Sequence, residues 1–315
     1  MRKNIVISIV VIVVTFTLLG LIADRSYKAG SNVAYDKYYI NNENDLIEFS
    51  RQVNSGNTFQ NTIVVQTADL DMTGIQWQTI APFDSESEFC GIYDGDGYII
   101  SNLNVNTDGN NALFGKLGGV VMNLGIINSY IHGSCVGVIT SHSSNEKATI
   151  INCYSEAYVT GDRVGGIADN FNGDIANCWS DCILNSQDKY MQGGIVSYSS
   201  TGMINCYCIG KSVNYEYKRA GSTDIKGINS QEELIRKLNR NIYSSAKAVN
   251  VDYRLLNKWE INEGGKVVLT HEKTANNLSF SQYISSVIFY FPALVAFVVM
   301  TIILSNMPID NKKQY

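Results

Sequence analysis

Two short acidic segments are the first places where this chain could carry out chemistry. Asp69 and Asp71 are two residues apart, so in an extended strand they would lie on one side and could act as acid and base, as carboxylates do in glycosidases. Asp94 and Asp96 resemble the start of a calcium loop, but Tyr98 occupies the fifth position and no glutamate closes the loop. Both segments are more typical of turns or caps between strands.

The histidines and cysteines do not show the spacing of a metal site or of a nucleophilic pair. His132, His142 and His271 are scattered and have no ligand spacing to Cys135 or to one another. A Cys135 nucleophile paired with His132 or His142 would also need an orienting third group, which the sequence does not show. We therefore predict no catalytic residue, no metal and no cofactor.

The elements that must position any site follow from an internal repeat. A Gly-Gly-Ile-like segment and a later Asn-Cys pair recur together, with successive copies 25 to 29 residues apart. The distance between the two halves is 11 residues in three copies and 15 in the fourth, which predicts a loop insertion at residues 143–147. The copies begin near Leu113, Val138, Ile167 and Ile195. A period this short is typical of a solenoid whose coils stack on their neighbours.

Each repeat is predicted to contain two short strands, one at Gly-Gly-Ile and one at Ile-x-Asn-Cys. In the copy that contains Ile175 and Cys178, these two residues are three apart, so a bend at Asn177 would turn both inward. Asparagine tolerates such a bend, and its amide could bond the asparagine one coil above. The sequence therefore predicts a ladder of asparagines along one corner of the solenoid.

An aromatic residue follows the cysteine in three copies. Tyr154, Trp179 and Tyr207 are expected to form an outward aromatic stack. Aromatic faces stack on sugars and are frequent in protein interfaces, so this stack is the predicted binding site. Ordinary stacking between neighbouring strands is the alternative.

Seven cysteines would usually indicate disulfides in an exported domain. The repeat instead places Cys153, Cys178 and Cys206 at one inward position, where a free thiol acts as a small apolar group. Stacked side chains that point the same way fit disulfide torsions badly. The sequence leaves open the pairing of three further cysteines, Cys90, Cys135 and Cys182.

Helical segments bracket the repeats. Apolar spacing predicts a helix over residues 44–56 with Asn42 or Asn44 as its cap, and Ser230 with Glu233 predicts the capped start of a second helix. A solenoid needs polar caps at its terminal edges, so we expect these helices to serve as caps. Strands are predicted at 62–66, 98–100 and 103–105, and a hairpin at 258–261 and 266–269.

The segment Phe89–Leu103 resembles the Phe-x-Gly-x-Phe-Asp-Gly-x-Gly-x-x-Ile-x-x-Leu segment of bacterial surface proteins with GLUG motifs. The Asp69–Asp71 segment with Trp77, the paired glycines and the Asn-Cys pairs follow in the order of that family, and the likeness covers residues 43–271. It implies a right-handed parallel β-helix displayed on the bacterial surface, in adhesin-like proteins. The family has no shared catalytic residues, so the resemblance transfers none.

Two apolar runs predict contact with a lipid bilayer. Ile284–Leu304 is a 21-residue run without a charge, which is long enough for a transmembrane helix. Ile5–Ala23 follows Arg2 and Lys3 and is either an uncleaved signal anchor or a cleaved signal peptide. The positive-inside rule then places residues 24–283 outside the cell and the tail inside.

The charge of the exported part narrows the choice of partner. The whole chain has a net charge of −5, and both ends are basic, so residues 24–283 carry −8. Nucleic acid requires lysine and arginine against its phosphates, so it is not expected to bind here. A low-charge surface rich in asparagine, serine, glycine and tyrosine suits a glycan or a protein.

The sequence as a whole predicts an all-β solenoid, a right-handed parallel β-helix with short helical caps and flanking transmembrane helices. The predicted parts are a signal anchor or signal peptide (1–23), a linker (24–42), an N-terminal cap with the first coils (43–111), the repeat β-helix (112–210), a C-terminal capping segment (211–275), a transmembrane helix (284–304) and a cytoplasmic tail (305–315). We expect a non-catalytic, adhesin-like binding module at the bacterial cell surface. A carbohydrate-active β-helix enzyme and a structural subunit of an envelope complex are the alternatives.

Overall fold

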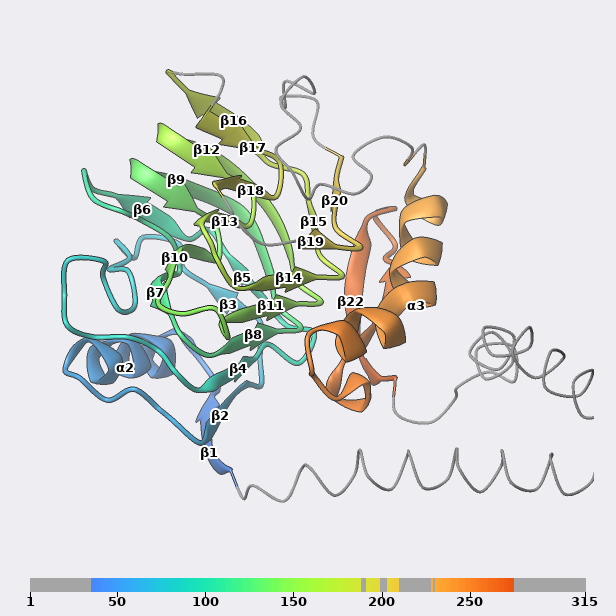
Figure 1. Ribbon diagram of the computed structural model, residues 1–315, viewed down its shortest axis with the longest axis horizontal. Helices are drawn as coiled ribbons and strands as arrows, with labels where there is room; N and C mark the ends of the chain where they lie inside the picture. The colour runs from blue at the N-terminus through green and yellow to red at the C-terminus, as the bar shows by residue number, and fades with distance from the viewer. Residues whose placement is uncertain (1–34, 188–190, 199–202, 210–227, 229, 275–315) are drawn as a thin grey trace, which may run out of the picture. The chain divides into compact units, whose positions relative to one another are not determined.

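A computed structural model describes residues 35–187, 191–198, 203–209, 228 and 230–274 of the chain. They form an all-β parallel solenoid of about six turns with few helices, and the described residues up to Lys273 belong to one compact unit (Figure 1). The predicted spans at 5–23 and 284–304 lie outside the described residues. Within the described part, no helix combines the length and the apolar character needed to cross a bilayer.

Three parallel sheets make up the walls of the solenoid. The first contains β1 (Asp36–Ile40), β2 (Thr62–Gln66), β4 (Ile92–Asp94), β8 (Val120–Met122), β11 (Thr149–Ile151), β14 (Asp174–Ala176) and β19 (Met203–Ile204). The second contains β7 (Phe114–Leu117), β10 (Thr140–Ser143), β13 (Ala168–Asn170) and β18 (Val196–Tyr198). The third contains β3 (Leu70–Asp71), β5 (Ile99–Ser101), β9 (Gly125–Gly137), β12 (Tyr154–Gly165), β15 (Trp179–Ser180) and β20 (Tyr207–Cys208), joined by β6 (Asn104–Asn106), β16 (Ile183–Ser186) and β17 (Gln192–Gly193). The predicted solenoid is therefore confirmed.

The register of neighbouring coils matches the repeat. Ile167 and Ile195 lie one coil apart, both are buried, and Ile167 N donates to Ile195 O at 2.8 Å. The prediction that Gly-Gly-Ile forms a strand is wrong, however. β12 ends at Gly165 and β13 begins at Ala168, so this segment turns the corner between two sheets. Small residues suit such a corner because the backbones of adjacent coils approach closely there.

The predicted asparagine ladder forms the corner between the first and third sheets. Asn123, Asn152, Asn177 and Asn205 all have positive φ, between 54° and 58°. Asn152 Nδ2 donates to Asn123 Oδ1, and Asn177 Nδ2 donates to Asn152 Oδ1, each at 2.8 Å. The ladder ends where Asn123 Nδ2 donates to Asp94 Oδ1 at 2.7 Å. An ionised carboxylate can only accept hydrogen bonds, so Asn123 presents its Nδ2 to Asp94, and each amide of the ladder donates to the one before it. If the Asn177 amide were turned over, its nitrogen would face Asn205 Nδ2, which is also a donor.

The cysteines follow the prediction from the repeat. Cys153, Cys178 and Cys206 are buried one above another, and Cys153 N donates to Cys178 Sγ at 3.4 Å. All seven cysteines are free thiols, and Cys90 and Cys135, outside the stacked position, are only partly buried. Burial raises the pKa of the Cys182 thiol to about 12, so it stays neutral at ordinary pH. These side chains therefore fill the core as small apolar groups.

The N-terminal helix covers the core at the first coils, as predicted. α2 (Glu43–Asn54) begins after Asn42, whose Oδ1 accepts from Asp45 N at 3.1 Å. Phe49 on its buried face packs edge-on against Phe59, with ring centroids 4.9 Å apart, and against Phe89 at 5.5 Å. An aromatic cluster thus seals this end of the core from water.

The C-terminal segment was predicted to cap the far edge of the solenoid, but it packs along the side. It consists of α3 (Gln231–Ala248), a 3₁₀ turn (Tyr253–Leu255) and the antiparallel hairpin of β21 (Asn257–Ile261) and β22 (Val267–Lys273). Ile242 and Ala246 of α3 pack with Met122, Ile151 and Ala176, which lie on three successive strands of the first sheet. Figure 1 shows α3 and β22 beside the stacked strands. We call residues 231–273 the strap.

Candidate functional site

The aromatic row predicted as the binding site is buried. Tyr154 and Trp179 stack with ring centroids 5.0 Å apart and planes 12° apart, and Tyr207 continues the row in register. Their exposed fractions are only 1%, 2% and 5%. Stacking between coils was therefore predicted correctly, but the row is not an outer surface.

The strap covers this row with its own apolar side chains. Leu234 and Leu238 of α3 and Trp259 of β21 belong to the same buried cluster as the three rings. Trp259 meets Tyr154 at 5.9 Å and 65°. The row is thus an internal interface between the third sheet and the strap.

The strap is also hydrogen-bonded to the asparagine ladder. Trp259 Nε1 donates to Asn152 Oδ1 at 2.7 Å, and Asn152 Nδ2 donates to Asn257 O at 3.0 Å. One coil below, Asn257 N donates to Asn123 Oδ1 at 2.9 Å. The amides that stack the coils therefore also hold the strap in place.

A different pair of tyrosines lies on the outside of the third sheet. Tyr130 on β9 and Tyr158 on β12 are in register, and their rings stack with centroids 5.8 Å apart and planes 6° apart. They are 38% and 40% exposed, and Ile183, the next residue in the row, is 56% exposed. Asn104 on β6 continues the row on the other side of Tyr130.

A second row of polar residues runs beside the tyrosines, two positions further along each strand. It consists of Asn106, His132, Thr160 and Asn185, which are in register on β6, β9, β12 and β16. Residues two apart in a strand share a face, so both rows point outward. Asn185 Nδ2 links the rows by donating to Tyr158 Oη at 3.3 Å. We call these two rows, with Asn104 and Ile183 included, the tyrosine face.

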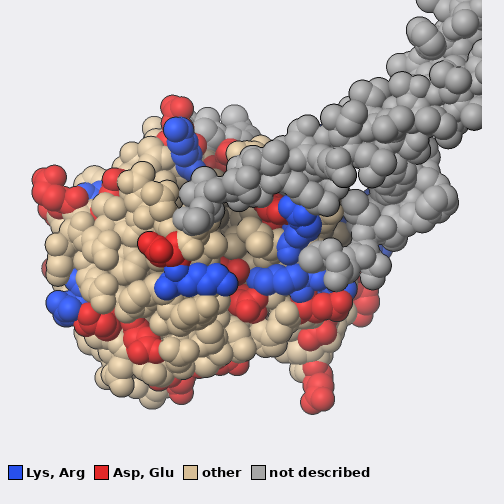
Figure 2. Space-filling model, turned by 90° about the horizontal axis from the view of Figure 1, so that it is seen from below, with Lys and Arg blue, Asp and Glu red and all other residues tan. Residues whose placement is uncertain are grey.

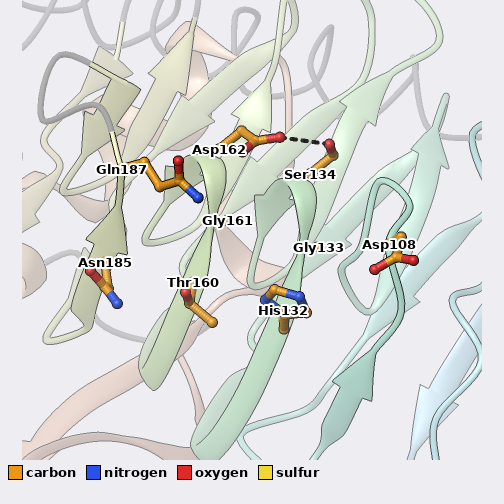
Figure 3. A pocket seen from close by; sticks show the side chains of 9 residues that line it. All are labelled: Asp108, His132, Gly133, Ser134, Thr160, Gly161, Asp162, Asn185 and Gln187. Atoms are coloured by element: carbon orange, nitrogen blue, oxygen red, sulfur yellow. Dashed lines mark hydrogen bonds between the residues drawn. The ribbon is translucent and has the colours of Figure 1, made fainter.

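An open groove of about 400 Å³ adjoins the polar row. Figure 3 shows His132, Thr160 and Asn185 lying across adjacent strands, with Asp108, Ser134, Asp162 and Gln187 around them. Ser134 Oγ donates to Asp162 Oδ2 at 2.9 Å. His132 Nδ1 is itself buried and bonds to none of the described residues.

Two glycines form part of the lining of the groove. Gly133 and Gly161 are paired in register, and a Cβ on Gly161 would lie 2.1 Å from Gly133 O. Any side chain at this position would collide with the backbone of the coil below. The strands therefore approach closely here, and neither glycine has a side chain.

The charge of the groove is acidic. Its described lining includes two carboxylates, Asp108 and Asp162, and neither lysine nor arginine. Figure 2 shows another face of the molecule, where basic side chains are interspersed with acidic ones. The groove thus lacks the cations that an anionic ligand would require.

The acidic segments considered as catalytic sites have structural roles. Asp71 accepts hydrogen bonds from Asn102 and Thr73, which lower the pKa of its carboxyl. Asp69 Oδ1 accepts from Ile99 N at 3.0 Å, so the two carboxylates are engaged in different turns. These contacts confirm the turn or cap role that the sequence favoured for both.

The other predicted candidates lie apart from one another. The His142 ring packs edge-on against Phe83 at 5.0 Å, and His271 Nδ1 lies 3.0 Å from Asp96 O, whereas His132 lies in the groove. Where a calcium ion would bind Asp94 and Asp96, the Lys273 ammonium lies 3.2 Å and 2.6 Å from their carboxylates. Within the described ranges, no group of histidine, cysteine and acidic residues could hold a metal ion.

Comparison with known proteins gives two limited similarities. No family model matches the chain. Halomucin of Haloquadratum walsbyi is 29% identical over an alignment of 168 residues that covers 46% of this chain, and the chain spans only 2% of the length of that protein. A crystal structure of a proposed immunoglobulin A1 protease from Bacteroides ovatus aligns over 75% of this chain and 93% of its own, at 19% identity and a TM-score of 0.47, which is too low to support an argument. Neither similarity assigns a family, and the resemblance to GLUG proteins stays a prediction.

Sequence reasoning missed the tyrosine face, although a signal was present. Tyr130-Ile131-His132 and Tyr158-Val159-Thr160 alternate between outward and inward residues and are one repeat apart. Ile131 and Val159 are fully buried, as that alternation requires. The predicted binding site instead consisted of the aromatic residues that follow the Asn-Cys pairs.

Proposed function

We propose that this chain is a non-catalytic binding module on the outside of a bacterial cell, and that its tyrosine face binds a neutral glycan. The proposal rests chiefly on the exposed stack of Tyr130 and Tyr158, which lies next to a row of amide, hydroxyl and imidazole groups. Exposed large aromatic side chains in a continuous row are costly to leave in water and commonly mark a binding surface. Two predicted membrane segments, outside the described residues, would tether the module.

The chemistry of the face favours sugars over other ligands. A glycan offers apolar C–H faces to aromatic rings and hydroxyls to neighbouring polar groups, and the tyrosine face offers both kinds of contact in adjacent rows. Asp108 and Asp162 in the groove would repel an anionic polymer. Successive coils repeat at about 4.8 Å, so an extended chain that lies across the strands would meet equivalent positions on each coil.

Binding of the full-length protein to immobilised neutral polysaccharides tests this function. A panel of a β-glucan, a mannan and a galactan is compared with the anionic polymer hyaluronan. We expect at least one neutral polymer to bind, and Tyr158→Ala to weaken its binding about tenfold, which corresponds to about 1.4 kcal/mol. Tyr39→Ala is the matched control, because Tyr39 is 50% exposed but lies on β1 of the first sheet.

Three results would contradict the proposal. One is that none of the neutral polymers binds; another is that the two alanine variants lose the same affinity. The third is the release of shortened oligosaccharides during incubation, which would support the carbohydrate-active enzyme instead.

A further inference from the structure

The last residue of the hairpin lies beside two groups with which it could react. Lys273 Nζ is 2.8 Å from Asn257 Oδ1 and 3.2 Å from Asp94 Oδ2. Asn257 is fully buried, and Asp94 is only 7% exposed. A lysine amine held against a side-chain amide, with a carboxyl group at hand to move protons, has the parts needed for acyl transfer.

We propose that Lys273 and Asn257 become joined by an isopeptide bond, with Asp94 moving the proton. Asp94 first takes a proton from the Lys273 ammonium, and the free amine attacks Cγ of Asn257. The new C–N bond forms as the bond from Cγ to Nδ2 breaks. The leaving nitrogen takes one proton from the attacking amine and the proton held by Asp94, and it departs as ammonium, which leaves Asp94 ionised again. No oxidant, reductant or cofactor is needed, because the reaction exchanges one amide for another.

The amide that would react is held in place by its surroundings. Asn257 Nδ2 donates to Thr270 O at 2.6 Å, and the backbone nitrogen of Asn257 donates to the asparagine ladder. On the opposite side, Gly97 has φ +86°, and a Cβ there would lie 2.3 Å from Thr270 O and 3.1 Å from Asn257 Nδ2. Only glycine allows the turn that carries Asp94 to approach the hairpin this closely.

The surroundings of Asp94 suit it to the transfer of a proton. Its Oδ1 accepts from Asn123 Nδ2 at 2.7 Å and from Asp96 N at 3.0 Å, so Oδ2 is the oxygen that faces Lys273. Burial raises the pKa of the Asp94 carboxyl, against the opposing effect of the Lys273 charge. A carboxyl that is less acidic than usual takes a proton from an ammonium more readily. Asp96 Oδ1 lies 2.6 Å from the same Nζ and keeps the lysine in position.

The bond would close the open end of the hairpin. Asn257 and Lys273 are cross-strand partners at the base of β21 and β22. A covalent link here would prevent the hairpin from opening when the chain beyond Lys273 is pulled. It is independent of the proposed function, because it requires nothing of the tyrosine face.

Peptide mapping of the full-length protein by mass spectrometry tests the proposal. The protein is digested with a glutamate-specific protease, and the peptides that contain Asn257 and Lys273 are identified. We expect one branched peptide, lighter than the two linear peptides together by the mass of one ammonia molecule. Recovery of both peptides in linear form with unchanged masses would overturn the proposal.

Two variants show whether the assigned residues are responsible. Lys273→Arg keeps the positive charge but cannot form the bond, so only linear peptides are expected. Asp94→Asn keeps an oxygen that can accept from Asn123 but removes the proton acceptor, so we expect the branched peptide to be lost or formed far more slowly. A branched peptide from Lys273→Arg would disprove the assignment of the lysine, and an undiminished yield from Asp94→Asn would disprove the role of the carboxyl.

Discussion

Removal of one ladder asparagine should destabilise the protein far more than removal of an exposed residue with the same backbone conformation. In Asn152→Ala, Trp259 Nε1, Asn257 O and Asn177 Nδ2 each lose the partner that they have in the wild-type protein. A buried polar group left without a partner costs about 1–3 kcal/mol, so three of them cost at least about 3 kcal/mol. Alanine at the Asn152 φ of 58° adds about 1 kcal/mol of backbone strain. The expected loss is about 4 kcal/mol or more.

Asn128→Ala is the control that isolates the hydrogen bonds. Asn128 is exposed and has a φ of 51°, so alanine there has the same strain without the buried contacts, and the expected loss is about 1 kcal/mol. Urea denaturation followed by circular dichroism measures both variants against the wild-type protein. If the two variants lose the same unfolding free energy to within about 1 kcal/mol, the ladder does not hold the strap and the reasoning is refuted.

Three further changes test the packing and charge assignments. Ile167→Ala should lower the unfolding free energy by about 2–5 kcal/mol, because Ile167 is fully buried between coils, and a thermal melt like that of the wild type would contradict this stacking. Cys206→Ser should change the unfolding free energy little, because a hydroxyl can donate to the carbonyl oxygens that Cys206 Sγ contacts at 3.4 and 3.5 Å. A reducing agent should leave the melting temperature of the wild-type protein unchanged, and a large drop in that temperature would reveal a disulfide. The Arg51 guanidinium lowers the pKa of Glu48 to about 2, so their ion pair should contribute stability above pH 4.5 that is lost as the pH falls toward 2. The difference in stability between wild type and Arg51→Gln should shrink over that range, and a constant difference would show that the pair is not formed.

The coils and their register could be predicted because a solenoid repeats one local geometry. Asn152 and Asn177 recur because each coil needs a residue that accepts positive φ and can bond its neighbour. Cys153 and Cys178 recur because each coil has the same small space beside that corner. These requirements are local, so residues that meet them recur in the sequence from one coil to the next.

The burial of the predicted site could not be predicted, because it depends on a contact between distant segments. Tyr154 and Trp179 are covered by residues 59 to 105 positions later in the chain, such as Leu238 and Trp259. The sequence predicts the capped start of the strap helix at Ser230, but not which surface the helix covers. Tyr130 and Tyr158 stay exposed because the strap covers the other part of the third sheet.

Footprinting of the full-length protein by hydroxyl radicals tests the central claim most directly. The protein is oxidised with and without a saturating amount of the neutral polysaccharide that it binds, and the modification of each tyrosine is measured by mass spectrometry. We predict that bound polysaccharide protects Tyr130 and Tyr158, and leaves the modification of the exposed Tyr39 unchanged. Protection of Tyr39 alone, or equal modification of all three with and without ligand, would contradict the account.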